Sequence, residues 1–322
     1  MTFKKLFYTT ILLSACIITV MVSFNIYMNE YGLFGNAKGK SIKVWNNERT
    51  SKYLLSYNYI PANFEGILIG PSVSDNLDTK KISGFKIYNA SINGGNISEL
   101  KYVAENVIQR GSLKFIIICL TPYITKDSGR KTSYIRSREY WGALGSKETI
   151  KFYLYKMFIM LGLKYDAYND HGYNNFNLFN KKPVAANAEL ITKSHPKSDS
   201  SAIKKNKDNY MEFIDEIAYN ELFEIITLSR KKGVKIFGFY YPYYIEIYNE
   251  KRFITYKEKI DKLFDEKDVI WNLNDDEHLA FRSDPSNYYD RGHLSWKGTN
   301  YLIREINNKL NVFYRRNSNE AL

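Results

Sequence analysis

Cysteine is scarce in this sequence of 322 residues, which contains only two. Cys16 lies in one long apolar run and Cys119 in another, so we do not expect the two thiols to meet. Their placement excludes a disulfide framework and a metal site built from cysteines. Histidine is scarce as well, with four residues, which limits the candidates for an imidazole base.

Charge is absent from residues 6–27, an apolar stretch near the N-terminus. A helix rises about 1.5 Å per residue, so a stretch of this length spans a bilayer core of about 30 Å. The only charges before it, Lys4 and Lys5, are positive, and Glu30 is the first charge after it. Because Lys and Arg stay on the cytoplasmic side, we predict a single-pass inner-membrane anchor with the N-terminus inside and the remaining chain periplasmic or extracellular.

Two other interpretations of the N-terminus stay open. A secretory signal peptide also has a basic start and an apolar stretch, and residues 13–16 resemble a bacterial lipoprotein processing site at Cys16. However, residues 17–22 continue the apolar run, whereas a lipidated mature protein usually begins with polar residues. We therefore favour an uncleaved anchor over lipoprotein processing or simple secretion.

Recognisable nucleic-acid-binding motifs are also absent, although the net charge of +12 would suit an acidic partner. Lys, Asn, Ile, Tyr and Phe are abundant together, as an AT-rich coding sequence produces without selection for binding. An exported domain would not meet nucleic acid. We therefore expect no nucleic-acid partner, and the coding bias explains the net charge better than an anionic glycan or phospholipid partner does.

Strand-like and helical patterns alternate along the rest of the chain. Apolar runs predict strands at residues 66–70, 85–91, 114–121, 234–241 and 268–274, and helical spacing predicts helices at 98–109, 210–232, 250–264 and 295–310. Asn96 is expected to cap the first of these helices and Gly233 to close the second. Because parallel strands need crossover connections, this alternation favours an α/β domain with a parallel sheet covered on both faces.

The chain divides on this basis into four parts: a cytoplasmic start and anchor (1–28), a polar and aromatic approach segment (29–60), an α/β domain (61–314) and a tail (315–322). Residues 123–209 are too many for a simple connection, so we predict an insertion with structure of its own. Its first half has helical aromatic content, while residues 182–209 are polar and charged. The insertion could overhang a site at the strand ends or only pack on the sheet edge.

Ser72 follows the first predicted strand, where a parallel sheet places its ligands. A serine hydroxyl needs a base to become a nucleophile, usually a histidine oriented by a carboxylate. Asp290 and His293 have a spacing that lets the carboxylate accept from Nδ1 while Nε2 points toward Ser72. We predict these three as the catalytic residues, with no metal and no cofactor.

A second Asp-x-x-His pair, Asp275 and His278, competes with the first. We prefer the later pair because Ser295, a plausible helix cap, follows it and begins a helix that would hold the loop. His278 lies in an acidic cluster and is expected to be solvated. His171 and His195 fall in the insertion without readable partners.

The turn at residues 93–96, with two glycines before a helix, is the second clue to a site. Glycine lets backbone N–H groups approach an anion, so the amides of Gly94, Gly95 and Ser72 could stabilise an oxyanion. An ordinary tight turn is the alternative.

Together these residues resemble the SGNH/GDSL hydrolase superfamily, in sparse blocks over residues 66–310. Ser72 with the two residues before it looks like the first block, residues 93–95 look like the glycine block, and Asp290 with His293 matches the last block. The resemblance implies a flavodoxin-like three-layer α/β/α fold with Ser72 as nucleophile. Pro71 replaces the usual acidic residue of the first block. The third block offers Thr121 where an asparagine is usual, so Thr121 or backbone donors would have to serve the oxyanion.

Residues 25–34 and 70–76 are also similar to membrane-anchored members that act on bacterial surface polysaccharides, such as the D-alanyl-lipoteichoic acid transfer and alginate O-acetylation proteins. This similarity implies ester hydrolysis or O-acyl transfer on a cell-envelope or exported polysaccharide, with a membrane acyl-donor protein as a partner. A non-catalytic glycan-binding or assembly subunit with the same fold is the alternative, as is an esterase of lipids or small esters.

Overall fold

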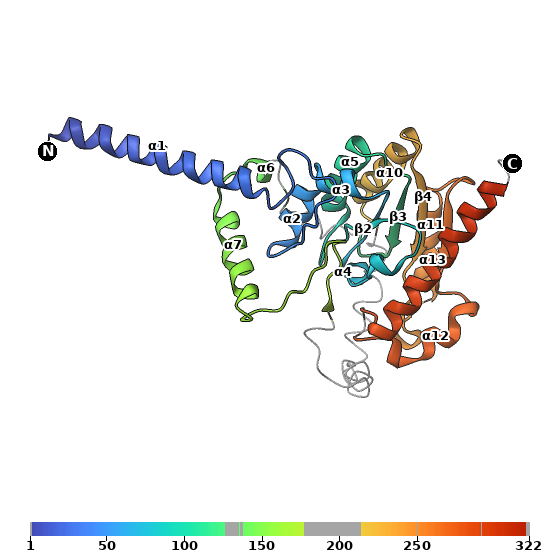
Figure 1. The fold of residues 1–322 in the computed structure, drawn as a ribbon. Helices are drawn as coiled ribbons and strands as arrows, with labels where there is room; N and C mark the ends of the chain where they lie inside the picture. Colours follow the sequence, from blue (N-terminus) through green and yellow to red (C-terminus); the bar gives the residue numbers. More distant parts are fainter. Residues whose placement is uncertain are drawn as a thin grey trace.

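A five-stranded parallel sheet forms the centre of the computed structural model, which describes residues 2–125, 135, 138–176, 214–248, 250–290 and 292–319 (Figure 1). The strands are β1 (Gly66–Ile69), β2 (Ile87–Asn89), β3 (Phe115–Leu120), β4 (Lys235–Tyr240) and β5 (Val269–Asn272). Their order, β2-β1-β3-β4-β5, is that of flavodoxin-like folds. The predicted α/β class is confirmed, and all five predicted strands are present, each shorter than its predicted range, β2 and β5 most of all.

The two faces of the sheet carry separate hydrophobic clusters, because successive side chains of a strand point to opposite faces. Ile116 and Ile118 of β3 belong to the cluster under α5 (Ile97–Arg110) and α10 (Glu216–Lys231). Phe115 and Ile117 belong to the cluster under α13 (Trp296–Asn319). Every residue of β3 is buried, which explains its continuous apolar sequence.

Several predicted helix ends need correction. Asn96 caps α5 as expected, but α10 begins at Glu216 with Asp215 as its cap, so Ile214 precedes the helix; residues 210–213 lie outside the described ranges. The helix predicted to end at residue 310 continues to Asn319. Between the strands and before α13 lie α4 (Ser72–Asp75), α11 (Glu250–Asp261), α12 (Leu279–Ser283) and the 3-10 turns η1 (Thr79–Lys81), η5 (Ile245–Ile247), η6 (Asp276–His278) and η7 (Pro285–Asn287).

The approach segment is more structured than its polar composition suggests. It forms α2 (Glu48–Leu55) and α3 (Tyr59–Asn63), neither of which was predicted. Leu54, Leu55, Tyr59 and Ile60 are at most 1% exposed and join the cluster under α5. The segment is therefore part of the core rather than a linker.

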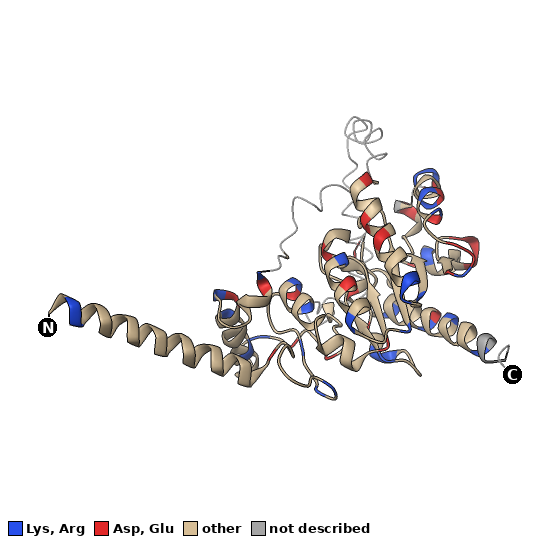
Figure 2. Ribbon diagram, turned by 90° about the horizontal axis from the view of Figure 1, so that it is seen from above, with Lys and Arg blue, Asp and Glu red and all other residues tan. Residues whose placement is uncertain are grey.

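Helix α1 (Phe3–Met28) extends away from the α/β domain (Figure 1). Over the described part of the chain it is the one helix long and apolar enough to cross a membrane, with a mean hydropathy of 2.1. Figure 2 shows it free of charge except at its start. Its exposed apolar surface is what a membrane span would present to lipid.

The described part of the insertion contains α6 (Glu139–Gly142) and α7 (Lys147–Met160), as its helical pattern predicted. The chain then runs to the edge of the sheet, where the N–H of Asn89 in β2 donates to the carbonyl of His171 at 2.7 Å. Residues 182–209, the polar and charged later part of the insertion, lie outside the described ranges.

Candidate active site

Ser72 is the first residue of α4, directly after the turn that ends β1. This turn requires glycine at position 70: a Cβ there would lie 2.2 Å from Ser74 Oγ and 2.7 Å from Cys119 Cβ. The close approach allows the chain to reverse at the carboxyl edge of the sheet. Ser72 itself remains partly exposed and is accessible to solvent.

A continuous hydrogen-bonded chain joins Ser72, His293 and Asp290. The Ser72 hydroxyl and His293 Nε2 are 3.0 Å apart, and His293 Nδ1 is 3.0 Å from both carboxylate oxygens of Asp290. A carboxylate accepts only, so Nδ1 carries the proton and Nε2 is left to accept from the serine. The structure thus brings the three predicted catalytic residues together in the geometry of a nucleophile, base and orienting acid.

Asp290 is held as the ionised partner. Burial raises the pKa of its carboxyl group, but hydrogen bonds from the His293 side chain and from the N–H groups of Gly292 and His293 outweigh this and lower the pKa below its ordinary value. The two backbone donors lie 2.7 and 2.8 Å from Oδ1. The same contacts close the loop into an Asx-type turn that orients the imidazole.

The loop that carries His293 is fastened both next to α4 and to the end of β4. Asn76, one residue beyond α4, donates from Nδ2 to the carbonyl of Leu294 at 3.1 Å. The N–H of Leu294 donates to the hydroxyl of Tyr241 at 2.9 Å. Ser295 accepts from the N–H of Gly298 at 3.3 Å and caps α13, as predicted. These contacts position His293 against Ser72 across a separation of 221 residues.

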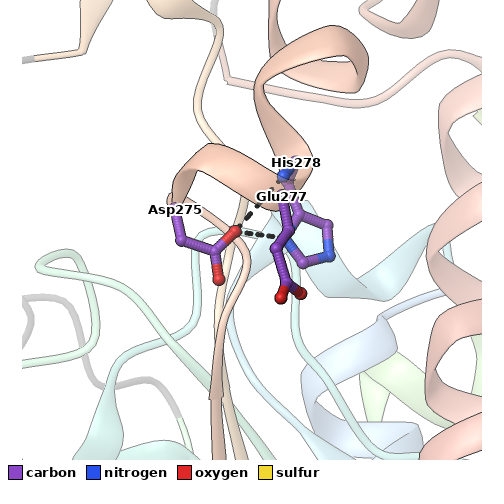
Figure 3. A group of neighbouring side chains, drawn as sticks. All are labelled: Asp275, Glu277 and His278. Carbon is purple, nitrogen blue, oxygen red and sulfur yellow. Dashed lines mark hydrogen bonds and ion pairs between the residues drawn. The ribbon is translucent and has the colours of Figure 1, made fainter.

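The second pair, Asp275 and His278, forms a separate turn (Figure 3). Asp275 caps η6: its Oδ1 accepts from the N–H of His278 at 3.2 Å and lies 2.5 Å from Nδ1 of the same residue. The expectation of a solvated His278 is wrong, because the residue is 8% exposed and its ring lies against Tyr301. Glu277 completes a group whose ligand atoms lie within 4.8 Å of one another, and the contacts within it are those of a helix cap.

The remaining two histidines have different outcomes. His171 does have a partner, contrary to the sequence analysis: its Nδ1 is 3.1 Å from the carbonyl of Ile87, and its ring packs edge-on against Phe64. Burial lowers its pKa. His195 lies outside the described residues.

The glycine turn supplies fewer candidate oxyanion donors than predicted. The N–H of Gly95 donates to the carbonyl of Ile92 at 2.8 Å, so it closes the turn instead of facing the site. Gly94 adopts φ of 61°, a left-handed conformation suited to glycine, and its N–H donates to no described backbone carbonyl or side chain. Thr121 Oγ1 is buried at the end of β3 and also lacks a hydrogen-bond partner among the described residues. Gly94 and Thr121 therefore remain as candidate donors with the Ser72 amide.

A buried ionic cluster lies behind the site and was missed by the sequence analysis. Lys52 of α2 is fully buried, with Nζ 2.7 Å from Asp75 of α4, 2.7 Å from Glu48 and 2.5 Å from the carbonyl of Ser91. Glu48 also accepts from the N–H of Asn93 at 3.0 Å. The cluster therefore connects α4 to the glycine turn.

The electrostatics of this cluster follow from two carboxylates sharing one ammonium group. Burial lowers the pKa of Lys52, but the charges of Asp75 and Glu48 outweigh it and raise the pKa, so the lysine stays protonated. Burial and repulsion from Glu48 raise the pKa of Asp75 well above its ordinary value. Because α2 was not predicted, the i, i+4 spacing of Glu48 and Lys52 did not reveal the cluster in the sequence.

The insertion lies at the sheet edge and also next to the site at the strand ends, the two positions that the sequence left open. Besides pairing with the edge of β2, it contacts α4: Asn174 donates from its backbone to the carbonyl of Asp75 at 3.0 Å and from Nδ2 to Asp75 Oδ2 at 2.9 Å. The ring of Phe176 then lies edge-on to the ring of His293, with centroids 5.6 Å apart. The insertion therefore packs on the sheet edge and also forms one wall of the site.

No known family profile matches this chain, and no curated protein is similar to it. Among solved structures, the chain is similar to a protein from Streptococcus pneumonia that is provisionally described as a platelet activating factor. The TM-score is 0.44 and the identity 13%, over 82% of this chain and 91% of that one. A likeness at this level says nothing of the activity of the present protein.

Proposed function

We propose that this protein is a serine ester hydrolase or O-acyltransferase that uses Ser72, His293 and Asp290. The observation that carries the proposal is the hydrogen-bonded chain from Ser72 Oγ through His293 to Asp290 at the carboxyl edge of the sheet. Ligand sites of open parallel sheets lie at this edge.

The proposed reaction begins with attack of Ser72 Oγ on the carbonyl carbon of an ester. His293 Nε2 takes the hydroxyl proton as the C–O bond forms, and the imidazolium is stabilised by Asp290. Collapse of the tetrahedral intermediate breaks the ester C–O bond, and His293 returns the proton to the leaving alcohol. The acyl group then stays on Ser72 until water or an acceptor hydroxyl attacks it by the same steps in reverse order.

The negative charge of the tetrahedral intermediate needs donors placed on the carbonyl oxygen. We assign this role to the amides of Ser72 and Gly94 and the hydroxyl of Thr121. A buried hydroxyl without a partner costs free energy in the resting protein, and an oxyanion would supply the missing acceptor. Thr121 stands where the resemblance would place an asparagine.

The proposed substrate is an acylated cell-envelope or exported polysaccharide. Helix α1 supports a membrane location, and the positive charges at its start support an orientation with the α/β domain outside the cytoplasmic membrane. Such a location limits the substrates to envelope components, and an acyl-donor protein in the same membrane would be a suitable partner for transfer.

A genetic comparison tests this function. Ser72→Ala should abolish the change in ester content of the envelope glycan that the wild-type protein causes in cells. Ser83→Ala, an exposed serine beyond α4, serves as the matched control and should behave as wild type. Normal glycan acylation in the Ser72→Ala strain, with the variant present in the membrane at wild-type levels, would refute the proposed role.

A non-catalytic glycan-binding or assembly subunit is the second candidate function, favoured by the absence of the third-block asparagine. It predicts that Ser72→Ala keeps full function in cells, whereas a variant that does not fold loses this function. An esterase of lipids or small esters is a further option for the same triad, and it predicts turnover of short-chain esters without any change in the glycan.

A further inference from the structure

We propose that α7 lies in the head-group region of the membrane with an apolar stripe facing the lipid. The stripe consists of Ile150, Leu154 and Met157 of α7 and of Leu161, the residue that caps its end. This inference rests on the membrane anchorage included in the proposed function, and it adds a second membrane contact that fixes how the α/β domain sits above the bilayer.

The stripe follows the repeat of a helix. Its residues are spaced at i, i+4, i+7 and i+11, which places them on one face. Their exposures are 57%, 46%, 44% and 63%, high values for large apolar side chains. Over the described part of the chain nothing covers them, and such a contiguous exposed patch is typical of an interaction surface.

The opposite face of α7 is already occupied by protein. Phe152 is 1% exposed, and its ring packs on that of Tyr31 with centroids 5.1 Å apart. Thr149, on the same side, is 4% exposed. The stripe therefore points away from the domain, so the domain itself cannot bury it.

Helix α7 is fastened to the end of α1, which fixes its position relative to the membrane. Asn25 of α1 donates from Nδ2 to the carbonyl of Leu144 at 3.0 Å and accepts from the Tyr153 hydroxyl at 2.8 Å. The side chain of Met21 lies against Gly145, where a Cβ would fall 2.4 Å from the methionine methyl group. Figure 1 shows α7 running crosswise to α1 at this junction. If α1 crosses the bilayer, α7 lies along the bilayer surface.

The level of α7 along α1 matches the boundary of the bilayer. Lys156 of α7 pairs at 2.5 Å with Glu30, the first charge after the apolar run, and lies over the ring of Trp45. Trp and Lys are common at this depth. Exposed Lys147 flanks the stripe and would face anionic head groups, and Lys151 beside it pairs with Glu148 at 2.8 Å.

Continuity with α1 favours lipid over a second copy of the chain as the occupant of the stripe. A second copy of the chain would have to bind the stripe at the membrane surface beside α1. The bilayer needs no such partner, because α1 already places α7 next to it. The contact also bears on the site: the chain leaving α7 runs through residues 161–176 to Phe176, which lies against His293. Docking of α7 would thus set the distance between Ser72 and the membrane surface.

Depth-dependent fluorescence quenching of the full chain in lipid vesicles tests this inference. Cys16→Ser removes the exposed thiol, and Cys119 is buried, so single cysteines can carry an environment-sensitive dye. The test position is Leu154→Cys. Tyr102→Cys, 48% exposed on α5, is the matched control in water, and Leu13→Cys in α1 reports on the anchor. The vesicles contain phosphatidylglycerol and lipids with a nitroxide at carbon 5 or carbon 12 of the acyl chain.

We expect the dye at Leu154→Cys to emit at shorter wavelength and to be quenched about twofold or more by the shallow nitroxide, and less by the deep one. The dye at Leu13→Cys should be quenched most by the deep nitroxide, and that at Tyr102→Cys by neither. Quenching at Leu13→Cys without quenching at Leu154→Cys would overturn the inference and leave the anchor intact. Absence of quenching at both would overturn the anchor and the inference together. A blue-shifted but unquenched dye at Leu154→Cys would show that protein covers the stripe, which also overturns the inference.

Discussion

Replacement of Lys52 by methionine tests whether the buried ionic cluster holds the site together. The ammonium group is fully buried and contacts Asp75, Glu48 and the carbonyl of Ser91 within 2.7 Å. Methionine keeps the length of the side chain and removes the charge. Two carboxylates would then remain buried near each other without a counter-ion.

The expected cost is large compared with the stability of a typical domain. Removing one partner of a buried ion pair costs about 3–5 kcal/mol, against a typical total of about 5–15 kcal/mol. The matched control is Lys114→Met, because Lys114 pairs with Glu65 at 2.6 Å but its side chain is 62% exposed. An exposed pair of this kind contributes about 0–1 kcal/mol.

Urea unfolding of the full chain in detergent micelles, followed by tryptophan fluorescence, would measure both costs. Lys52→Met with Asp75→Asn should recover part of the loss, because one uncompensated charge is removed. The pKa of Asp75 is already raised in the native protein and should rise further in Lys52→Met. A group with a raised folded pKa favours folding below its unfolded pKa and loses this contribution as pH rises, so the deficit of Lys52→Met should shrink on acidification. Equal midpoints for Lys52→Met and Lys114→Met would refute the reasoning.

Two further predictions concern the site itself. Thr121→Val should lower kcat of ester hydrolysis by about 10²–10³-fold if the hydroxyl serves the oxyanion, and it should cost little stability because that hydroxyl has no described partner. Thr121→Ser keeps a hydroxyl and should retain most of the activity. Equal rates for both variants and the wild type would remove Thr121 from the mechanism. Asp290→Asn should lower kcat by about 10²–10⁴-fold through loss of the imidazole tautomer, which steady-state kinetics would measure. Because the pKa of Asp290 is lowered on folding, its contribution to stability is present above its unfolded pKa and is lost as pH falls through the folded value. Acid unfolding of Asp290→Asn should therefore depend less steeply on pH below about 4, and an unchanged acid transition would contradict the assignment.

Local patterns were sufficient to predict the sheet and to place Ser72, Asp290 and His293 together at its edge. The apolar runs ending before Ser72 and Thr121 are continuous because β1 and β3 are buried on both faces. Such a run can be recognised from the local sequence alone. The Asp290 and His293 pair was readable because its contacts lie within one turn of loop.

Features that depend on contacts distant in sequence could not be predicted. The charge of Lys52 indicates a solvated helix face, and only the positions of Asp75 and Ser91 explain why it is buried. The sequence does not show that the N–H of Gly95 donates to the carbonyl of Ile92, and this bond is what leaves Gly94 rather than Gly95 as a candidate oxyanion donor. His278 was misplaced because its acidic neighbours suggested solvent, whereas α13 supplies Tyr301 to cover it.

Covalent labelling of Ser72 tests the central claim most directly. The full-length protein is treated with a fluorophosphonate, and the adduct is located by mass spectrometry of its peptides. The proposed triad predicts one adduct, on Ser72, that disappears in Ser72→Ala and is strongly slowed in His293→Ala, while Ser83→Ala labels as wild type. A folded wild-type protein that takes up no label at Ser72 would contradict a nucleophilic serine at this site.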